Sequence, residues 1–149
     1  MKISIGCDHT ALELKQELIL FLEKLGHSVK DCGTFSKNSC DYTDFGIQVA
    51  EDVHKGYADR GLVLCYTGIG MSIIANKIRG VRCALVHTVE EAILTRNHND
   101  SNCLALSAKY TDLDLAKEIV SAWLNTSFSN EERHKRRIDK ITAYEEECK

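Results

Sequence analysis

The chain has 149 residues, of which 44% are hydrophobic and 28% are charged, and its formal net charge at pH 7 is −3. These values are typical of a globular protein, and the length predicts a single domain over residues 1–149. The charge argues against a long basic surface for nucleic acid, and no apolar run approaches the roughly 20 residues that a membrane helix needs.

Hydrophobic patterning predicts strands that alternate with helices along most of the chain. The predicted strands cover residues 2–7, 27–32, 61–65, 82–87 and 103–106. The predicted helices cover residues 12–25, 45–53, 71–78, 89–95 and 113–124. Such alternation indicates a three-layer, doubly wound, Rossmann-like α/β fold with a five-stranded parallel sheet. We expect an extra C-terminal helix over residues 130–148, outside this core and available to pack on a partner chain.

Three polar clusters fall where a doubly wound fold binds its ligands, beyond the carboxyl ends of the strands. We expect residues 8–9, 65–70 and 98–100 in the loops after the first, third and fifth strands. One such residue alone is as often a helix cap or a core group as a ligand-binding group. All three clusters together favour a binding site.

The loop after the third predicted strand combines a cysteine with two glycines, since Cys65 ends the strand and Gly68 and Gly70 follow. Glycines let backbone N–H groups approach an anion, and the positive end of a helix stabilises negative charge. The loop lacks the third glycine of the dinucleotide fingerprint and the Lys-Ser/Thr ending of a P-loop. We therefore favour a small-substrate site and interpret Cys65 as a base, because its position favours the thiolate.

The chain contains seven cysteines, an odd number, and none forms a Cys-x-x-Cys pair. With no signal peptide before the first strand, this pattern indicates a reducing compartment, which we take to be the cytoplasm. No histidines have the i, i+4 spacing of a zinc site, so we expect no metal. Four cysteines are interpreted as core residues, namely Cys7, Cys32, Cys83 and Cys103.

Two arginines of the predicted C-terminal helix, Arg133 and Arg137, are four residues apart and therefore lie on one face of it. Two guanidinium groups so placed form a clamp for a single phosphate. A solvated basic face is the more ordinary interpretation of the spacing alone.

A series of short motifs runs through the whole chain. In order, they are Gly6-Cys7-Asp8-His9, Asp41-Tyr42, residues 64–73, Ala75-Asn76-Lys77, residues 96–102, Ala122-Trp123-Leu124, and Arg133 with Arg137. This series resembles the ribose-5-phosphate isomerase B and galactose-6-phosphate isomerase family. The resemblance implies an aldose-ketose isomerase of the pentose phosphate pathway that interconverts D-ribose 5-phosphate and D-ribulose 5-phosphate without a cofactor. It also implies a homodimer, or a dimer of dimers, whose active sites are shared between two subunits.

The resemblance implies a role for each candidate residue. Cys65 moves a proton between C1 and C2 through a cis-enediolate, and Thr67 assists the proton transfer between hydroxyl groups. His98 opens the sugar ring with help from Asp8. The loop that stabilises the enediolate comprises Tyr66, Thr67, Gly68, Ile69 and Gly70. The groups that hold the sugar phosphate are Asp8, His9, Asn99, Arg133, Arg137 and, from the partner chain, Lys109.

Two departures from the family leave the substrate open. Lys109 stands where arginine is frequent, so a point charge replaces a bidentate fork, and Tyr66 stands where glycine is frequent. An isomerase of a six-carbon sugar phosphate, allose 6-phosphate or galactose 6-phosphate, uses the same chemistry. A nucleotide-binding or redox-sensing module is the alternative from another class, because a Rossmann-like fold specifies no function by itself. Met71 and Ser72 exclude the branch of the family that uses a glutamate in this loop.

Overall fold

The computed structural model describes residues 1–147 and confirms the alternation of strands and helices. The strands are β1 (Lys2–Cys7), β2 (Ser28–Asp31), β3 (Arg60–Cys65), β4 (Cys83–Leu85) and β5 (Cys103–Ser107). The helices are η1 (His9–Ala11, a 3-10 turn), α1 (Leu12–Lys24), α2 (Tyr42–His54), α3 (Ile69–Ala75), α4 (Val89–Asn99), α5 (Leu113–Asn125) and α6 (Glu132–Glu147). Cys148, the expected end of the last helix, lies outside the described residues.

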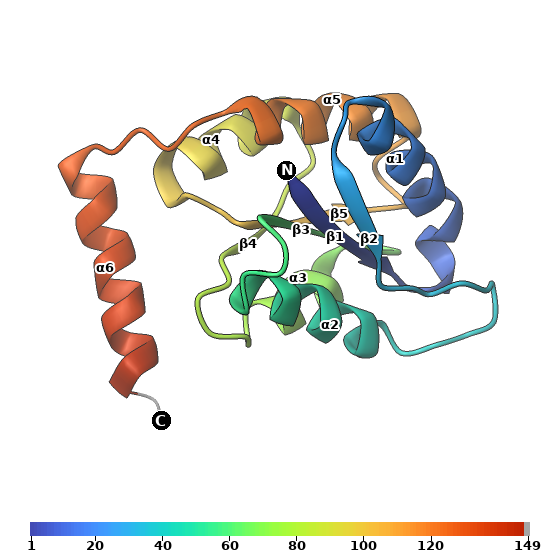
Figure 1. Ribbon diagram of the computed structural model, residues 1–149, viewed down its shortest axis with the longest axis horizontal. Helices are drawn as coiled ribbons and strands as arrows, with labels where there is room; N and C mark the ends of the chain where they lie inside the picture. Colours follow the sequence, from blue (N-terminus) through green and yellow to red (C-terminus); the bar gives the residue numbers. More distant parts are fainter. Residues whose placement is uncertain (148–149) are drawn as a thin grey trace.

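The five strands form one parallel sheet in the order β2-β1-β3-β5-β4. Helices α1, α4 and α5 cover one face of the sheet, and α2 and α3 cover the other (Figure 1). This arrangement confirms the doubly wound fold. The chain leaves β1 toward one face and β3 toward the other, and doubly wound folds bind ligands beyond the carboxyl ends of neighbouring strands that diverge in this way.

Alternation along the central strand β3 divides the core between the two faces of the sheet. Leu62 and Leu64 pack with α1, α4 and α5, whereas Val63 and Cys65 belong to the cluster under α2 and α3. All four are buried. Because successive side chains of a strand point to opposite faces, Cys65 is directed toward the N-terminus of α3.

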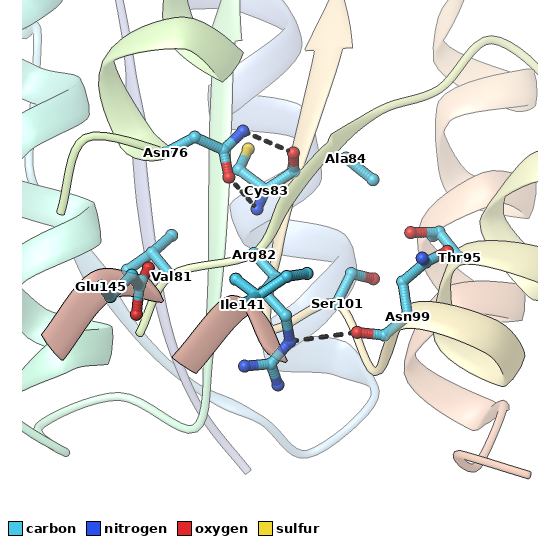
Figure 2. A pocket seen from close by; sticks show the side chains of 10 residues that line it. All are labelled: Asn76, Val81, Arg82, Cys83, Ala84, Thr95, Asn99, Ser101, Ile141 and Glu145. Carbon is cyan, nitrogen blue, oxygen red and sulfur yellow. Dashed lines mark hydrogen bonds between the residues drawn. The ribbon is translucent and has the colours of Figure 1, made fainter. Parts of the chain in front are cut away.

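The edge strand β4 is shorter than the predicted range of residues 82–87. The side chain of Asn76 lies beside it, accepting a hydrogen bond from the backbone N–H of Cys83 and donating one to its C=O, both at 2.8 Å (Figure 2). An amide side chain thus takes the place of a neighbouring strand, and it satisfies the backbone groups that an edge strand leaves unpaired.

Helix α6 stands beside the sheet and helices rather than covering them (Figure 1). Its C-terminal half reaches back to one turn, where Glu146 pairs with Arg79 at 3.1 Å and Glu145 accepts a hydrogen bond from the Gly80 N–H at 3.0 Å. Ile141 and Tyr144 on this helix are 47% and 67% exposed. Within residues 1–147, no helix has the length and apolarity needed to cross a membrane.

Candidate active site

The first group of predicted site residues, which we call the loop site, comprises Asp8, His9 and residues 65–70. Cys7 is paired with Leu64 in the sheet, and the Asp8 N–H donates to the Leu64 C=O at 3.1 Å. Asp8 and Cys65 therefore leave neighbouring strands at the same level. Adjacent strands are about 4.8 Å apart, so both residues lie close together where β1 and β3 diverge.

The thiol of Cys65 is 5% exposed and accepts a hydrogen bond from the backbone N–H of Gly68 at 3.2 Å. Gly68 has a φ of 77°, and a Cβ there would lie 2.5 Å from Leu85 Cδ1 and 3.0 Å from the Leu106 backbone. Only glycine fits this position. The tight turn aims an N–H group at the sulfur, and such a bond stabilises a thiolate more than a thiol.

Tyr66 is tied to the loop after β5 by its backbone. Its C=O accepts hydrogen bonds from the Ser107 hydroxyl at 2.8 Å and from the Lys109 N–H at 3.0 Å. Its ring is 51% exposed, and Lys109 Nζ lies 5.2 Å from the ring centre. The ring therefore points outward rather than into the core, and its face contacts the ammonium group of Lys109.

The rest of the loop is held from two sides. The Thr67 hydroxyl accepts a hydrogen bond from the Ile69 N–H at 3.4 Å, and Ile69 is itself 51% exposed. A Cβ on Gly70 would lie 2.7 to 3.0 Å from the ring of Tyr42. The Tyr42 ring thus lies directly against the glycine backbone and forms a wall of the loop site.

Asp8 and His9 face the loop from the end of β1. Asp8 is buried, and its Oδ1 accepts hydrogen bonds from the Thr10 N–H at 2.9 Å and the Thr10 hydroxyl at 2.6 Å, which leaves Oδ2 for a ligand. His9 Nδ1 accepts a hydrogen bond from the Cys40 N–H at 3.3 Å. A neutral imidazole that accepts at Nδ1 carries its proton on Nε2, so Nε2 is the atom through which His9 can donate. A hollow of about 250 Å³ adjoins His9 and Lys37.

The second group, which we call the helix site, comprises His98, Asn99, Arg133 and Arg137. The prediction that residues 98–100 follow the fifth strand was wrong, because α4 continues past Thr95 and these residues precede β5. His98 and Asn99 form the last turn of α4 and are exposed. The ring of His98 lies 4.5 Å, centre to centre, from the ring of His134 on α6. The end of α4 and the start of α6 are therefore neighbours.

The two arginines of the helix site are exposed on α6. Arg133 Nε pairs with Glu131 at 2.8 Å, and Arg137 lies one helical turn further along. Both side chains therefore extend from the same side of a helix that stands apart from the sheet.

One chain does not bring the loop site and the helix site together. Gly61 is level with Cys103 in the sheet, and Cys65 is level with Ser107. Four residues of strand span about 13 Å, and His98 precedes Cys103 by five residues more along the chain. The two sites therefore lie toward opposite ends of the strands. Lys109, which we expected to reach a partner's site, lies beside Tyr66 of its own chain.

A hollow lies between α6 and the edge of the sheet at β4 (Figure 2). It measures about 360 Å³, and its lining includes Asn99, Arg82, Ile141 and Glu145. Asn99 is the only predicted site residue in that lining. The hollow therefore belongs with the helix site and lies away from Cys65.

Three residues that contact the site were not predicted. Cys40 fixes the His9 ring through its backbone, Ser107 anchors Tyr66, and the buried His134 packs against His98. Cys40 and Ser107 act through contacts between distant segments, which no local pattern reveals. His134 lies between Arg133 and Arg137 in the sequence. Its place inside this basic cluster was the one signal by which the sequence could have indicated a role for it.

Three of the four cysteines interpreted as core residues are buried, namely Cys7, Cys32 and Cys103, while Cys83 is half-buried. Burial raises the pKa of the Cys7 thiol to about 12 and that of the Cys32 thiol to about 11. These two groups stay protonated and unreactive at neutral pH, unlike the thiolate expected of a base. Among residues 1–147, no three His, Cys, Asp or Glu side chains cluster as metal ligands do.

Comparisons with known proteins agree with this geometry. Residues 3–141 match the family described as ribose/galactose isomerase. Ribose-5-phosphate isomerase B of Escherichia coli is 42% identical over 145 residues, which cover 97% of each chain. The structure of the Clostridium thermocellum enzyme of that name is 46% identical, covers both chains completely and has a TM-score of 0.97. That of the Mycoplasma genitalium enzyme, with bound ribulose-5-phosphate, is 38% identical, covers 98% of this chain and 97% of its own, and has a TM-score of 0.94.

Proposed function

This chain belongs to the ribose/galactose isomerase family, and from that premise we propose that it interconverts D-ribose 5-phosphate and D-ribulose 5-phosphate. The observation that carries the proposal is the Cys65 thiol at the end of β3, with the Gly68 N–H directed at its sulfur at 3.2 Å. The reaction requires a base beside an anion-stabilising backbone. The loop site offers both in one turn of the chain.

The proton transfer starts from the open-chain aldose. The Cys65 thiolate removes the proton from C2, the electron pair forms the C1–C2 double bond, and negative charge moves to the oxygen on C1. The N–H groups of the loop stabilise this cis-enediolate. Thr67 relays the proton between the two oxygens, and the Cys65 thiol returns its own proton to C1. The product is the ketose, and the thiolate is regenerated.

Ring opening comes before this step when the substrate is ribose 5-phosphate, because its ring form has no acidic C–H beside a carbonyl. We assign the opening to His98 with Asp8, which exchange protons with the ring oxygen and the anomeric hydroxyl. The exposed ring of His98 and the free Oδ2 of Asp8 support this assignment. Asn99, next to His98, contacts the sugar.

Positive and hydrogen-bonding groups hold the phosphate. His9 donates through Nε2, a role supported by the Cys40 N–H bound to its Nδ1. Arg133 and Arg137 grip the phosphate from α6, and Lys109 completes the set as a point charge. The exposure of both arginines on a helix that stands apart from the sheet supports this role over a buried structural one.

The enzyme acts as a homodimer in which the loop site of one subunit meets the helix site of the other. This proposal is supported by the roughly 13 Å of strand between the two sites within one chain, since no single chain assembles the complete set. The exposed Ile141 on α6 and the hollow beside it supply apolar surface for a partner subunit.

The six-carbon alternative is favoured by one feature, the family's inclusion of galactose isomerases. In this proposal the sugar chain extends from the reacting carbons along a wall formed by Tyr42, Tyr66 and Lys109. These three side chains therefore discriminate between five- and six-carbon substrates. We place the reaction in the pentose phosphate pathway of the cytoplasm. Six unpaired cysteines among the described residues support a reducing compartment.

A panel assay of five- and six-carbon aldose phosphates with the purified protein tests the substrate. We expect turnover of ribose 5-phosphate to exceed that of allose 6-phosphate and galactose 6-phosphate, and the reverse ranking would favour the six-carbon alternative. A thermal-shift series with sugar phosphates, AMP, ATP and NAD accompanies it. Stabilisation by nucleotides alone would contradict an isomerase and revive the nucleotide-binding module.

A further inference from the structure

The turn that ends α4 has an uncommon backbone. Asp100 follows Asn99 directly and has φ 45° and ψ 45°, the left-handed conformation that glycine or asparagine usually supplies. Its N–H donates to the Arg96 C=O at 3.1 Å, and the Ser101 N–H donates to the Thr95 C=O at 3.2 Å. These bonds end the helix within two residues of His98.

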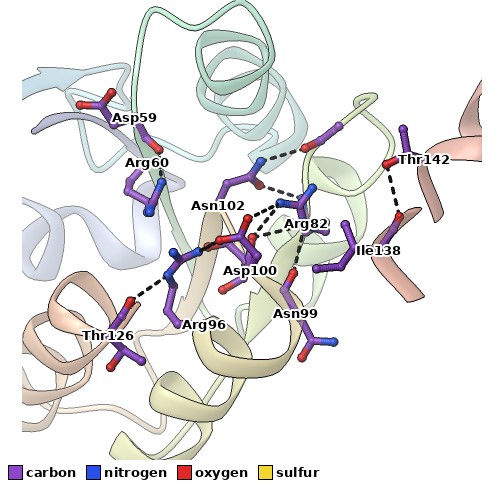
Figure 3. Close-up of polar contacts among 12 residues, drawn as sticks. Asp59, Arg60, Arg82, Arg96, Asn99, Asp100, Asn102, Thr126, Ile138 and Thr142 are labelled. Atoms are coloured by element: carbon purple, nitrogen blue, oxygen red, sulfur yellow. Dashed lines mark hydrogen bonds and ion pairs between the residues drawn. The ribbon is translucent and has the colours of Figure 1, made fainter. Parts of the chain in front are cut away.

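Two arginines from different segments converge on this turn (Figure 3). Arg96 Nη1 donates to Asp100 Oδ1 at 2.7 Å and to the Ser101 C=O at 2.6 Å. Arg82, just before β4, donates through Nε to the Asn99 C=O at 3.0 Å and through Nη2 to the Asp100 C=O at 2.8 Å. Three consecutive carbonyls and one carboxylate are thus held by two guanidinium groups.

The same cluster also reaches the segment that leads to α6. Arg96 Nε donates to the Thr126 C=O at 3.3 Å, immediately after α5. Further along that segment, the Ser129 N–H donates to the Asn97 C=O at 3.1 Å, and the Ser129 hydroxyl lies 3.0 Å from His134 Nδ1. His134 packs against His98. The buried Arg96 guanidinium therefore binds the start of the segment that leads to α6, and Ser129 and His134 complete the connection between the two halves of the helix site.

We propose that the clamp formed by Arg82, Arg96 and Asp100 is a positioning device that fixes the His98 ring for opening the sugar. The proposal rests on the proposed function, in which His98 carries out that step. A purely stabilising ion-pair network is the competing interpretation. The position of the clamp favours a positioning role, because its arginines bind the backbone C=O groups directly after His98. A shift of about 1 Å in a reacting group lowers turnover up to about 10²-fold.

Comparing turnover of the two substrates distinguishes a loss of His98 positioning from a loss of protein stability. Ribose 5-phosphate is a ring in water and needs opening, whereas ribulose 5-phosphate is open-chain, because its 5-hydroxyl is esterified and cannot close a ring on C2. Starting from the ketose, the enzyme can release the open-chain aldose, which cyclises spontaneously. A lesion in ring opening therefore slows turnover of ribose 5-phosphate selectively, whereas a partly unfolded enzyme loses both directions alike.

The decisive variant is Asp100→Gly, which accepts the left-handed backbone and removes the carboxylate. Asp100→Asn keeps both the backbone conformation and one neutral acceptor, and it decides the question if the glycine variant does not fold. Thr88→Ala is the matched control, because Thr88 caps the other end of α4 in a capping box far from His98. It weakens the same helix and leaves the clamp untouched.

We expect Asp100→Gly to lower kcat on ribose 5-phosphate about tenfold, and Asp100→Asn about threefold, with less than a twofold change on ribulose 5-phosphate. Thr88→Ala should lower Tm with no such directional loss. In a His98→Ala background, Asp100→Gly should have no further effect on ribose 5-phosphate. These results together would support the positioning role.

Two outcomes would overturn the inference, and they can be distinguished. If His98→Ala shows the directional loss while the Asp100 variants lose both directions equally or neither, the clamp is only structural and the proposed function stands. If His98→Ala itself shows no directional loss, the assignment of ring opening to His98 fails, and the positioning role fails with it.

Discussion

The loop site and the helix site of this chain are built in opposite ways. The loop site is formed by tight backbone turns at the end of buried strands, and the base proposed for it, Cys65, is 5% exposed. The helix site consists of long side chains on exposed helix surfaces, and α6 stands apart from the sheet that holds Cys65. The loop site is thus built on the backbone at the end of the sheet, whereas the helix site is built on exposed side chains.

The difference follows from the chemistry assigned to each. Proton transfer at carbon requires a desolvated base and backbone donors fixed relative to it, which the end of a central strand and a glycine turn supply. Phosphate binding requires positive charge on side chains long enough to extend to the ligand. Arginines on a helix that stands apart from the sheet supply it. The division predicts that damage to the loop site lowers kcat and that damage to the arginines raises KM.

Cys65→Ala tests the loop site most severely. We expect turnover to fall by roughly 10² to 10⁴, while affinity for a phosphate ligand stays nearly unchanged, because a general base acts on the barrier more than on binding. Steady-state kinetics and ligand titration measure the two quantities. Cys83→Ala, a half-buried thiol on β4, is the control and should retain turnover. Full activity in Cys65→Ala would remove this thiol from the mechanism.

Mixing mutants tests whether the two sites meet across subunits. Cys65→Ala and His98→Ala are unfolded and refolded together in equal amounts, which makes about half of the dimers mixed. Each mixed dimer has one site with both lesions and one intact site, so activity should recover to about a quarter of wild type after the His98→Ala baseline is subtracted. Verified heterodimers without recovered activity would mean that both residues serve a site within the same chain.

Arg133→Ala and Arg137→Ala test the helix site through binding. Each should raise KM about tenfold with a smaller change in kcat, because the phosphate is remote from the reacting carbons and each charged bond contributes about 1.5 to 3 kcal/mol. Arg136→Ala is the control, since Arg136 is also exposed but is turned around α6 by about 100° from Arg137 and about 60° from Arg133. An unchanged KM in both variants would return these arginines to an ordinary solvated face.

Gly68→Ala and Gly80→Ala distinguish the effect of crowding at the loop site from the effect of a positive φ alone. Both glycines have positive φ, at 77° and 74°, but only Gly68 is crowded, by Leu85 and the Leu106 backbone. Gly80→Ala should lower the free energy of unfolding by about 1 to 2 kcal/mol. Gly68→Ala should lower it by a further 1 to 3 kcal/mol and reduce kcat as well. Urea unfolding at one protein concentration measures the difference, and equal losses would contradict the packing argument.

The sequence was sufficient to predict the fold class and that the residues of the proposed loop site lie together. Strand and helix periods are local properties, and the loop site lies within a few residues of two strand ends, so neighbours in the chain remain neighbours in space. The expected strand over residues 2–7 matches β1, and the expected strand over residues 61–65 differs from β3 by one residue. Cys65, Thr67 and Gly68 are indeed gathered in one turn.

The tertiary structure decided where His98 lies and what it contacts. The expected helix over residues 89–95 was too short, since α4 continues to Asn99. It ends there because Asp100 takes a left-handed conformation that is more usual for glycine, and Arg96 of the same helix and the distant Arg82 hold that turn. Bonds such as Arg96 to Thr126 join segments 30 residues apart, so no local pattern encodes them. The separation of the two sites likewise depends on strand register, which forms only when the sheet assembles.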